Sequence, residues 1–573
     1  MNKLSRLALK NYKCFRNSDI NFRDTTIIVG KNNAGKSTII EALRLIAWVG
    51  KKSKSTTTYT NAPPNFNFGL SKKGIKLNTE KLKIDLRACG YFYATEVSTI
   101  TAIFKDKSKI EINIKDDIAF AVIYDNNEQM VKNRSKAMQL NFDTIGILPQ
   151  IGPIKENEKQ LNEDTVIADR ETYLSSRHFR NELKLYKKDF FDSFKKLSQE
   201  SWNGLKIDDL CYNPHESDNI QLYVQDDLFT AEIGRMGSGI QMWLQIIWFI
   251  CRSEKQNTII LDEPDVYMHP DLQRKLLHIL KSKFQQVIIA THSVEIISEV
   301  EPQNIVTIDK ESPHMKYANS NQAVQKIIDN IGSIHNLSLL RLSNNRKCIF
   351  VEGKDLKILS KFYELLYPNN YNPINSLPSV SLGGFSRLNE AFGTAKLFYE
   401  ETEGSVKTFC ILDSDYYPKE LLEAKLVQAK NNNLILHIWD KKEIENYILI
   451  PSAIFRITGR PLSEYNIFLD KFSELIENFK FQVQDQMASK LIEYKKELDA
   501  STCIKLAREI IDTRWTSIEN KLSLISGKEA ISKVNDWIKE CYNKSCSTDK
   551  IIKNIKKEEV DKEIISIIDN LIK

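Results

Sequence analysis

The feature that most constrains this chain is a glycine-rich loop near its N-terminus, Gly30-Lys31-Asn32-Asn33-Ala34-Gly35-Lys36-Ser37. It fits the pattern GxxxxGK[ST] and lies between a β-branched run, Thr25–Val29, and a segment with helical spacing, Ser37–Ala47. Backbone N–H groups of such a loop surround phosphates, while Lys36 neutralises their charge and the Ser37 hydroxyl binds Mg²⁺. A chance glycine-rich turn would not need this strand–loop–helix setting. The sequence predicts an ATP site that includes Gly30, Asn32, Asn33, Gly35, Lys36, Ser37 and Thr38.

A second segment, Ile259-Ile260-Leu261-Asp262-Glu263-Pro264, ends an apolar strand with two acids. The strand is expected to bring Asp262 to the Mg²⁺ of bound ATP and to place Glu263 where it polarises the attacking water. Taken alone, two acids at a strand end are equally consistent with a solvated turn. The phosphate loop in the same chain favours the catalytic interpretation.

Two further segments resemble motifs of the ABC class of ATPases. Gly237-Ser238-Gly239-Ile240-Gln241 resembles the signature, although Ile240 departs from its second glycine. The resemblance implies that Ser238 and Gly239 close over the γ-phosphate bound by an opposite protomer, so that ATP is held between two copies of the chain. Ile288-Ile289-Ala290-Thr291-His292-Ser293 resembles the strand and switch histidine; a hydrogen-bonded histidine at a strand end is the alternative for His292.

The stretch between the phosphate loop and the signature yields two more expectations. Gln150, in Leu148-Pro149-Gln150, is a candidate for the glutamine that joins the two lobes of such ATPases, although Pro-Gln turns are common. No sustained heptads occur in this stretch, which argues against the long coiled coils of the chromosome-maintenance relatives.

Later in the chain, acids follow two further predicted strands. Glu352 comes directly after Lys347–Val351, and Asp413 and Asp415 come after Thr408–Leu412. Parallel strands of an open α/β sheet bring such loops together at their carboxyl edge. Oxygen ligands suit Mg²⁺ or Mn²⁺, and two ions about 4 Å apart can activate water and stabilise the leaving oxygen of a phosphodiester. Solvated acids remain the alternative for each segment alone.

The two acidic segments, with Ser381-Leu382-Gly383-Gly384 between them, together resemble the Toprim fold, and an ABC-type ATPase followed by Toprim resembles the overcoming-lysogenisation-defect (OLD) nuclease family. The resemblance implies that Glu445, in Glu445-Asn446-Tyr447, is a further metal ligand. It also implies that Lys528, in Ser526-Gly527-Lys528-Glu529, is a catalytic lysine, whereas a solvated helix face is the default for a lysine in this charged tail. One departure is that Leu356 stands where Toprim nucleases place a second acid. Asp355 either replaces that acid with a shifted backbone or leaves a weakened metal position.

The chain of 573 residues is too long for one core, and its α/β pattern predicts three domains. Residues 1–342 are expected to form the ABC-type ATPase domain, a mixed sheet with helices, an antiparallel β lobe and a helical dimerisation segment at about residues 170–200. Residues 343–450 are expected to form the Toprim domain, and residues 451–573 a helical region that completes the nuclease site.

Composition narrows the cellular setting. The longest apolar run, Ile240–Cys251, is short and interrupted by glutamines, and the N-terminus lacks the apolar core of a secretory signal. The nine cysteines contain no CxxC pair, which argues against a zinc ribbon or a disulfide framework and favours a reducing, cytoplasmic location. A net charge of +6 permits a nucleic-acid partner without requiring one.

The expected function is an ATP-hydrolysing DNA endonuclease that depends on Mg²⁺ or Mn²⁺, with two ions in the Toprim site. The family resemblance implies bacterial anti-phage defence, a homodimer or tetramer through the ATPase domain, and a partner protein or nucleic acid. The rival class is a non-catalytic, ATP-gated DNA-maintenance clamp with a structural metal. Primase and topoisomerase are weaker candidates, because neither a zinc ribbon nor room for a tyrosine-bearing domain is evident.

Overall fold

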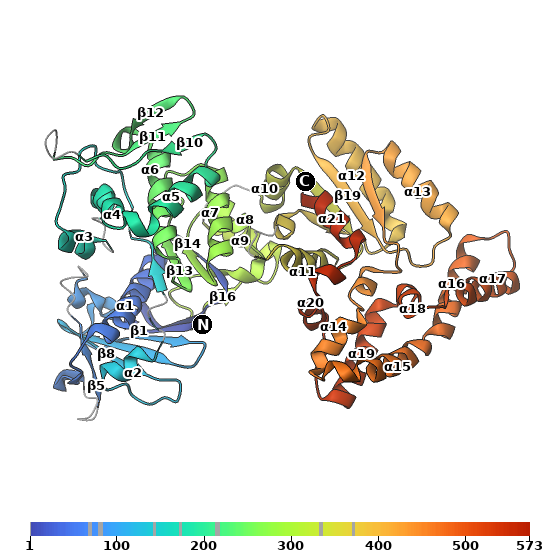
Figure 1. Cartoon of the computed structure of the whole chain (residues 1–573), viewed down its shortest axis with the longest axis horizontal. Helices are drawn as coiled ribbons and strands as arrows, with labels where there is room; N and C mark the ends of the chain where they lie inside the picture. The colour runs from blue at the N-terminus through green and yellow to red at the C-terminus, as the bar shows by residue number, and fades with distance from the viewer. Residues whose placement is uncertain are drawn as a thin grey trace. The chain divides into compact units, whose positions relative to one another are not determined.

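The computed structural model divides the chain into two compact units, Met1–Leu337 and Ser338–Lys573 (Figure 1). The residues that it describes are 2–66, 72–77, 84–140, 142, 145–149, 151–170, 175–212, 218–331, 336–353, 355–368 and 373–572. Within these ranges, no helix combines the length and the apolar character needed to cross a membrane.

The first unit is centred on a six-stranded sheet in the order β16-β15-β3-β14-β13-β9. Its strands pair in parallel except for β16, which is antiparallel to β15. The bounds are β3 Thr25–Val29, β9 Ile145–Ile147, β13 Thr258–Asp262, β14 Gln286–Ala290, β15 Ile305–Thr307 and β16 Lys316–Tyr317. β3, β13 and β14 are rich in isoleucine and buried on both faces, as expected for central parallel strands.

A second sheet of the first unit has seven antiparallel strands in the order β2-β1-β6-β7-β8-β5-β4. The bounds are β1 Leu4–Tyr12, β2 Phe15–Asn21, β4 Thr60–Asn61, β5 Lys73–Lys76, β6 Ser98–Phe104, β7 Lys109–Lys115 and β8 Ile118–Tyr124. The predicted antiparallel lobe is therefore confirmed over the described residues. Helix α1 (Lys36–Ser55) shares one core with this sheet and with Ile28, Ile260 and Ile288 of the parallel sheet.

Alternate residues of the parallel strands, such as Ile27, Ile259 and Ile289, face a second core with the helices of the other side. These helices are α4 Phe179–Leu185, α5 Lys187–Ser201, α6 Ser238–Arg252, α7 Pro270–Lys283, α8 Val294–Ser298 and α9 Asn321–Asn330. The segment expected to be helical at about residues 170–200 is helical from Ser175 onward, but Tyr186 leaves the helical conformation and separates α4 from α5. The smaller elements are α2 Arg134–Met138, α3 Glu163–Asp169 and a three-stranded sheet of β10 Leu205–Ile207, β11 Tyr223–Asp226 and β12 Phe229–Glu232.

The change of unit falls at the start of α10 (Leu337–Asn345), earlier than the expected boundary after residue 342. Its physical reason is packing, because Leu337 belongs to a core of the first unit whereas Leu342 packs against a core of the second. The residues just after the expected boundary, Ser343–Asn345, therefore belong to α10.

The second unit contains a four-stranded parallel sheet in the order β18-β17-β19-β20. The strands are β17 Lys347–Val351, β18 Ser379–Ser381, β19 Lys407–Leu412 and β20 Leu434–Ile438. Helices α12 (Leu388–Glu401) and α13 (Lys419–Asn431) cover one face (Figure 1). The other face packs on α11 (Asp355–Leu366) and on the C-terminal helices.

The C-terminal region of the second unit is helical, as predicted, and it does not have a separate core. Its helices are α14 Pro451–Thr458, α15 Tyr465–Glu477, α16 Lys480–Tyr494, α17 Ala500–Arg514, α18 Ile518–Leu524, α19 Gly527–Tyr542, α20 Thr548–Lys553 and α21 Lys562–Ile572. Residues Ile349 and Phe409 of the sheet join Phe472 and Ile564 of the helices in one buried cluster. The helices therefore hold a fixed position against the strands that carry the acids.

Candidate active sites

The predicted phosphate loop connects β3 to α1 in the first unit, as the strand–loop–helix pattern requires. Gly35 has a φ of 108°, and a Cβ at this position would lie 2.6 Å from the Phe15 ring and 2.9 Å from Cys14 Sγ. Only glycine fits both the conformation and the space. Asn32, Asn33 and Ser37 are exposed on the loop, whereas Thr38 is half-buried beside Cys14.

Lys36 is only 5% exposed and lies among the catalytic candidates from the neighbouring strands. Its Nζ donates to the carbonyl of Gly30 at 3.0 Å, lies 3.6 Å from Glu263 Oε1 and contacts His292 Nε2. His292 Nε2 lies 3.2 Å from Glu263 Oε1. The parallel strands β3, β13 and β14 thus bring the three residues together at one edge of the sheet, as the motifs predict.

Electrostatics at this edge suit a site for an anion and a metal. Burial lowers the pKa of Lys36, which nearby Glu263 opposes, and burial followed by the charge of Lys36 lowers the pKa of His292. Burial also raises the pKa of Asp262, and the neighbouring Glu263 adds to this effect. One Asp262 oxygen, Oδ1, is buried without a hydrogen-bond partner. A carboxylate oxygen left in this way is the donor that Mg²⁺ takes.

Glu263 directly follows β13 with a φ of 45°, a conformation that is costly for a glutamate. Its N–H donates to the carbonyl of Ala290 at 2.8 Å, which fixes the turn. Backbone strain of this kind clusters at sites where a side chain must be aimed.

Ser238 and Gly239 lie at the start of α6, and Ser238 is exposed. Within the described residues, no hydrogen bond or ion pair joins Ser238 to Lys36, Glu263 or His292 of the same chain. The remaining candidate of this half, Gln150, lies outside the described residues, although the carbonyl of the nearby Leu148 accepts from Arg44 at 3.3 Å.

In the second unit, acids gather at the carboxyl edge of the parallel sheet. Glu352 follows β17 and Asp413 follows β19, and the N–H of Asp413 donates to Glu352 Oε2 at 3.1 Å. Asp355 begins α11 and is 3% exposed, whereas the adjacent Leu356 packs against the apolar core. The Asp355 carboxylate is buried, and its charge contributes to the raised pKa of Asp413.

These buried carboxylates repel one another. Burial first, then Asp355 and Glu352, raise the pKa of Asp413 to about 9. Burial raises the pKa of Glu445 to about 7, and burial raises the pKa values of Glu352 and Asp355 as well. Oxygens of three acids are buried without a hydrogen-bond partner, namely Asp355 Oδ2, Asp413 Oδ1 and Glu445 Oε2. A cation at this place would relieve both the repulsion and the missing contacts.

Asp415 is the second acid after β19. It has a φ of 39° and is half-buried, and its charge contributes to the raised pKa of Glu352. The tight turn after β19 is therefore strained at the second acid of the Asp-x-Asp pair.

Lys528, the second residue of α19, extends toward the acids. Its Nζ lies 3.2 Å from Glu443 Oε2, 3.8 Å from Glu445 Oε2 and 3.9 Å from Asp413 Oδ2. Burial acts to lower the pKa of Lys528, but Glu445, Glu443 and Asp413 outweigh it and raise the pKa. The preceding Gly527 makes this approach possible, because a Cβ there would lie 2.8 Å from Glu445 Cβ.

Glu443 is a residue of this site that the sequence prediction missed. Its Oε1 accepts from the N–H of Lys528 at 2.9 Å and from Ser526 Oγ at 3.2 Å. Burial acts to raise the pKa of Glu443, but the Lys528 N–H and the Lys528 charge outweigh it and lower the pKa. The available signal was its place two residues before Glu445, in Glu443-Ile444-Glu445.

The acidic side chains of this site can be compared with the ligands that a metal ion requires. In the described part of the chain, no set of three or more His, Cys, Asp or Glu side chains is arranged to hold a metal ion. The unpartnered oxygens of Asp355, Asp413 and Glu445 are nevertheless the hard donors that Mg²⁺ or Mn²⁺ prefers. The chemistry of the donor set therefore fits such an ion, while Lys528 now supplies the compensating charge.

Comparison with known proteins finds a family model for part of the first unit and a relative that aligns with most of the chain. Residues 25–298 match the family model described as "AAA domain, putative AbiEii toxin, Type IV TA system". The chain is 21% identical over 492 residues to the Old nuclease of Escherichia phage P2, an alignment that covers 76% of this chain and 81% of that protein. The first unit therefore carries an ATPase domain, and the resemblance to the OLD family inferred from the motifs is confirmed.

Solved structures give weaker matches. The SMC head domain from Thermotoga maritima is 17% identical, covers 56% of this chain and 99% of its own, and has a TM-score of 0.32. The Smc head domain with an extended coiled coil, bound to the C-terminal domain of ScpA from Pyrococcus furiosus, is 15% identical, with coverages of 58% and 100% and a TM-score of 0.36.

Proposed function

We propose that this relative of the Old nuclease is an ATP-hydrolysing DNA endonuclease that depends on Mg²⁺ or Mn²⁺. The observation that carries the proposal is the group of acids at one sheet edge, the buried Asp355, Asp413 and Glu445 with the half-buried Glu352, and Lys528 directed at them. Such a concentration of repelling carboxylates is destabilising without a cation, so a stable fold alone does not account for it.

The ATPase half is proposed to be of the ABC type. Lys36 would neutralise the β- and γ-phosphates, Ser37 and Asp262 would hold Mg²⁺, and Glu263 would polarise water, with His292 beside it. Within the described residues, no hydrogen bond or ion pair joins the exposed Ser238 to Lys36, Glu263 or His292 of its own chain, which is consistent with a role over ATP bound by a second copy. The proposed assembly is therefore a homodimer or tetramer formed through the first unit.

The nuclease half is proposed to be a Toprim site within residues 343–450, completed by the helical region 451–573. The donors proposed for two ions are Glu352, Asp355, Asp413, Asp415 and Glu445. When bound, such ions activate water and stabilise the leaving oxygen of a phosphodiester. Lys528 would place its ammonium near the phosphate oxygens, and Glu443 would hold Lys528 in position through its N–H and its Nζ.

The proposed nuclease activity is tested with supercoiled plasmid incubated with Mg²⁺ or Mn²⁺, with and without ATP. Wild-type protein is expected to nick or linearise the plasmid, and Asp413→Ala is expected to leave it supercoiled. Asp536→Ala, an exposed acid on α19, is the matched control and should cut like the wild type. Cleavage by Asp413→Ala at the wild-type rate would contradict the proposal.

The rival function is an ATP-gated DNA-maintenance clamp in which the same acids hold a structural metal. It predicts DNA binding and ATP hydrolysis without plasmid cleavage under any of these conditions. The OLD relationship further motivates a proposed role in bacterial anti-phage defence in the cytoplasm, with a partner protein or nucleic acid. Infection of cells that carry the wild type or the Asp413→Ala variant tests that role by plaque counts.

A further inference from the structure

A fully buried arginine of α4, Arg180, joins segments of the first unit that are distant in the sequence. Its guanidinium donates to both oxygens of Glu232, with Nε to Oε1 at 2.7 Å and Nη2 to Oε2 at 2.5 Å. Its Nη1 donates to Glu158 Oε2 at 3.2 Å and to the carbonyl of Lys155 at 2.9 Å. One side chain thus holds α4, the 154–161 segment after β9, and the end of β12.

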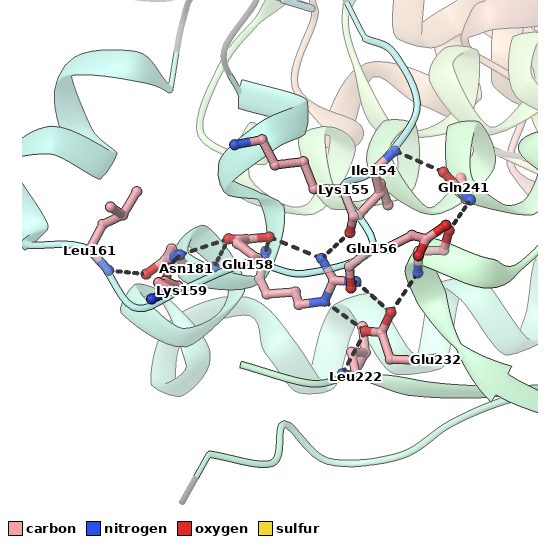
Figure 2. A network of polar contacts seen from close by, with 12 residues as sticks. Ile154, Lys155, Glu156, Glu158, Lys159, Leu161, Asn181, Leu222, Glu232 and Gln241 are labelled. Atoms are coloured by element: carbon pink, nitrogen blue, oxygen red, sulfur yellow. Dashed lines mark hydrogen bonds and ion pairs between the residues drawn. The ribbon is translucent and has the colours of Figure 1, made fainter. Parts of the chain in front are cut away.

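Glu158, which is 3% exposed, completes the contact with α4. Its Oε1 accepts from the N–H and the Nδ2 of Asn181 at 2.7 and 2.8 Å, and its Oε2 accepts from the N–H of Arg180 at 3.0 Å. Asn181 Oδ1 in turn accepts from the N–H of Leu161 at 2.8 Å (Figure 2). The 154–161 segment is therefore fixed to the start of α4 by side-chain and backbone groups together.

Glu232 carries this network into the turn that precedes Ser238. Its Oε2 accepts from the N–H of Gly234 at 2.8 Å, so the carboxylate that grips Arg180 also shapes the turn. A Cβ on Gly234 would lie 2.6 Å from the carbonyl of Lys155 and 3.0 Å from Arg180 Nη2. The turn packs too closely on the network for any larger residue.

Gln241, one turn into α6, fixes the other side of Ser238. Its Oε1 accepts from the N–H of Ile154 at 2.8 Å, while its Nε2 donates to the carbonyls of Gly234 at 3.2 Å and Met236 at 2.8 Å. The backbone before and after Ser238 is therefore bound to the same 154–158 segment, although Ser238 itself is exposed and, among the described residues, makes no hydrogen bond to this network.

We propose that Arg180 is a positioning residue that, through Glu158 and Glu232, holds Ser238 rigid for contact with ATP bound by a second copy of the chain. A serine meets a phosphate on another molecule productively only if its turn is ordered beforehand. The network also connects this turn to the chain that leaves β9, the strand paired with Asp262-bearing β13. The inference rests on the proposed ATP sandwich and deepens it.

The test is the steady-state ATPase activity of Arg180→Met, a substitution that keeps bulk and removes the charge and the five donors. We expect kcat to fall at least about tenfold, because a small misplacement of a reacting group is costly. The affinity for a non-hydrolysable ATP analogue should stay at the wild-type value, since Lys36 and its loop are untouched. An unchanged kcat would overturn the inference.

Arg252→Met is the matched control. Arg252 ends α6 and pairs with Glu182 of α4, with Nε 3.3 Å from Oε1, so the substitution disturbs a buried ion pair between the same two helices far from Ser238. This variant should retain the wild-type kcat. A tenfold loss in both variants would attribute the effect to general packing of α4 on α6 and would overturn the assignment to Arg180.

Mixing experiments separate an effect on the partner's ATP from an effect within one chain. Arg180→Met is mixed with Glu263→Gln, which keeps an intact Ser238 but hydrolyses slowly. One composite site of the mixed dimer then combines an intact Glu263 with an intact Ser238 turn, so activity should exceed the sum of the separate variants. Absence of this recovery would contradict the proposal for Arg180.

Ser238→Arg mixed with Glu263→Gln distinguishes this failure from failure of the proposed function. Recovery there, without recovery for Arg180→Met, would leave the sandwich standing and refute the role of Arg180 alone. Recovery in neither mixture would refute the sandwich and the inference with it. If Arg180→Met does not bind the nucleotide analogue, Glu232→Gln, which keeps the side-chain shape, replaces it in every arm and is judged by the same outcomes.

Discussion

In the first unit the phosphate-loop lysine is buried, at 5% exposure, whereas in the second unit Lys528 is 58% exposed and the acids around it are buried. Lys36 stands among residues from three adjacent parallel strands and one loop. The second site draws its acids from the segments that follow β17 and β19, from the start of α11 and from the turn at Glu443–Tyr447, and its lysine from α19. The first site thus places a lysine where an anion can bind, and the second places acids where a cation can bind.

The largest expected effect concerns Lys36, the positively charged residue at the centre of the first site. Lys36→Ala should reduce ATP hydrolysis to background, because the β- and γ-phosphates lose their counter-ion. Release of inorganic phosphate measures it. Glu263→Gln is the informative companion, since it should still bind ATP and turn it over slowly. Rapid hydrolysis by Glu263→Gln would remove Glu263 from the proposed role.

On the anion side, Asp413→Ala should eliminate plasmid cleavage and leave ATP hydrolysis near the wild-type rate. Because the substitution also removes one of several repelling buried acids, we expect the melting temperature of the metal-free protein to rise by about 2 °C or more. Calorimetry in the presence of EDTA measures this. A lower melting temperature in EDTA would show that Asp413 serves the fold and not a ligand.

Lys528→Ala should slow DNA cleavage by about a hundredfold, because a preorganised positive charge is lost near the phosphate oxygens. DNA binding and ATP hydrolysis should change little. Lys533→Ala is the control one turn further along α19; its Nζ lies 3.4 Å from Glu529 and over the ring of Phe479, away from the acids. Equal cleavage rates for the two variants would show that Lys528 is a solvated surface lysine without a role in cleavage.

The smallest expected effect concerns Glu559, a carboxylate that, unlike the candidate acids, already accepts several hydrogen bonds. Burial acts to raise the pKa of Glu559, but hydrogen bonds from Arg456, the Lys556 N–H and Ser452 bring it down to about 2. The depressed pKa stabilises the fold above the unfolded value of about 4.3, and this contribution is lost as the pH falls toward 2. Melting temperatures of the wild type and Glu559→Gln should therefore converge between about pH 4.3 and 2. A constant difference across this range would contradict the pairing.

What the sequence predicts well is local. The phosphate loop, the acids at the ends of β13, β17 and β19, and the histidine after β14 each lie within one short motif, so strand and turn patterns suffice to place them. The strand β18 was not predicted, because its three residues are exposed and carry no apolar alternation.

What the sequence does not show is contact between distant segments. Glu443 and Lys528 are separated by 85 residues and meet only because Gly527 lets α19 approach the turn at Glu445. Arg180 likewise binds Glu232 across 52 residues, and nothing in the local sequence of α4 distinguishes it from a solvated arginine. The expected helical character of this region does not show that Tyr186 divides it into α4 and α5.

The distance along the chain between Glu443 and Lys528 also has a consequence in time. At a synthesis rate of about 5–20 residues per second, the lysine emerges about 4–17 s after the glutamate that holds it. By then the whole first unit has been made and is free to fold. We expect the nascent protein to acquire the fold that binds ATP before its proposed cutting site is complete, so that an unfinished chain is harmless to the DNA of the cell that makes it.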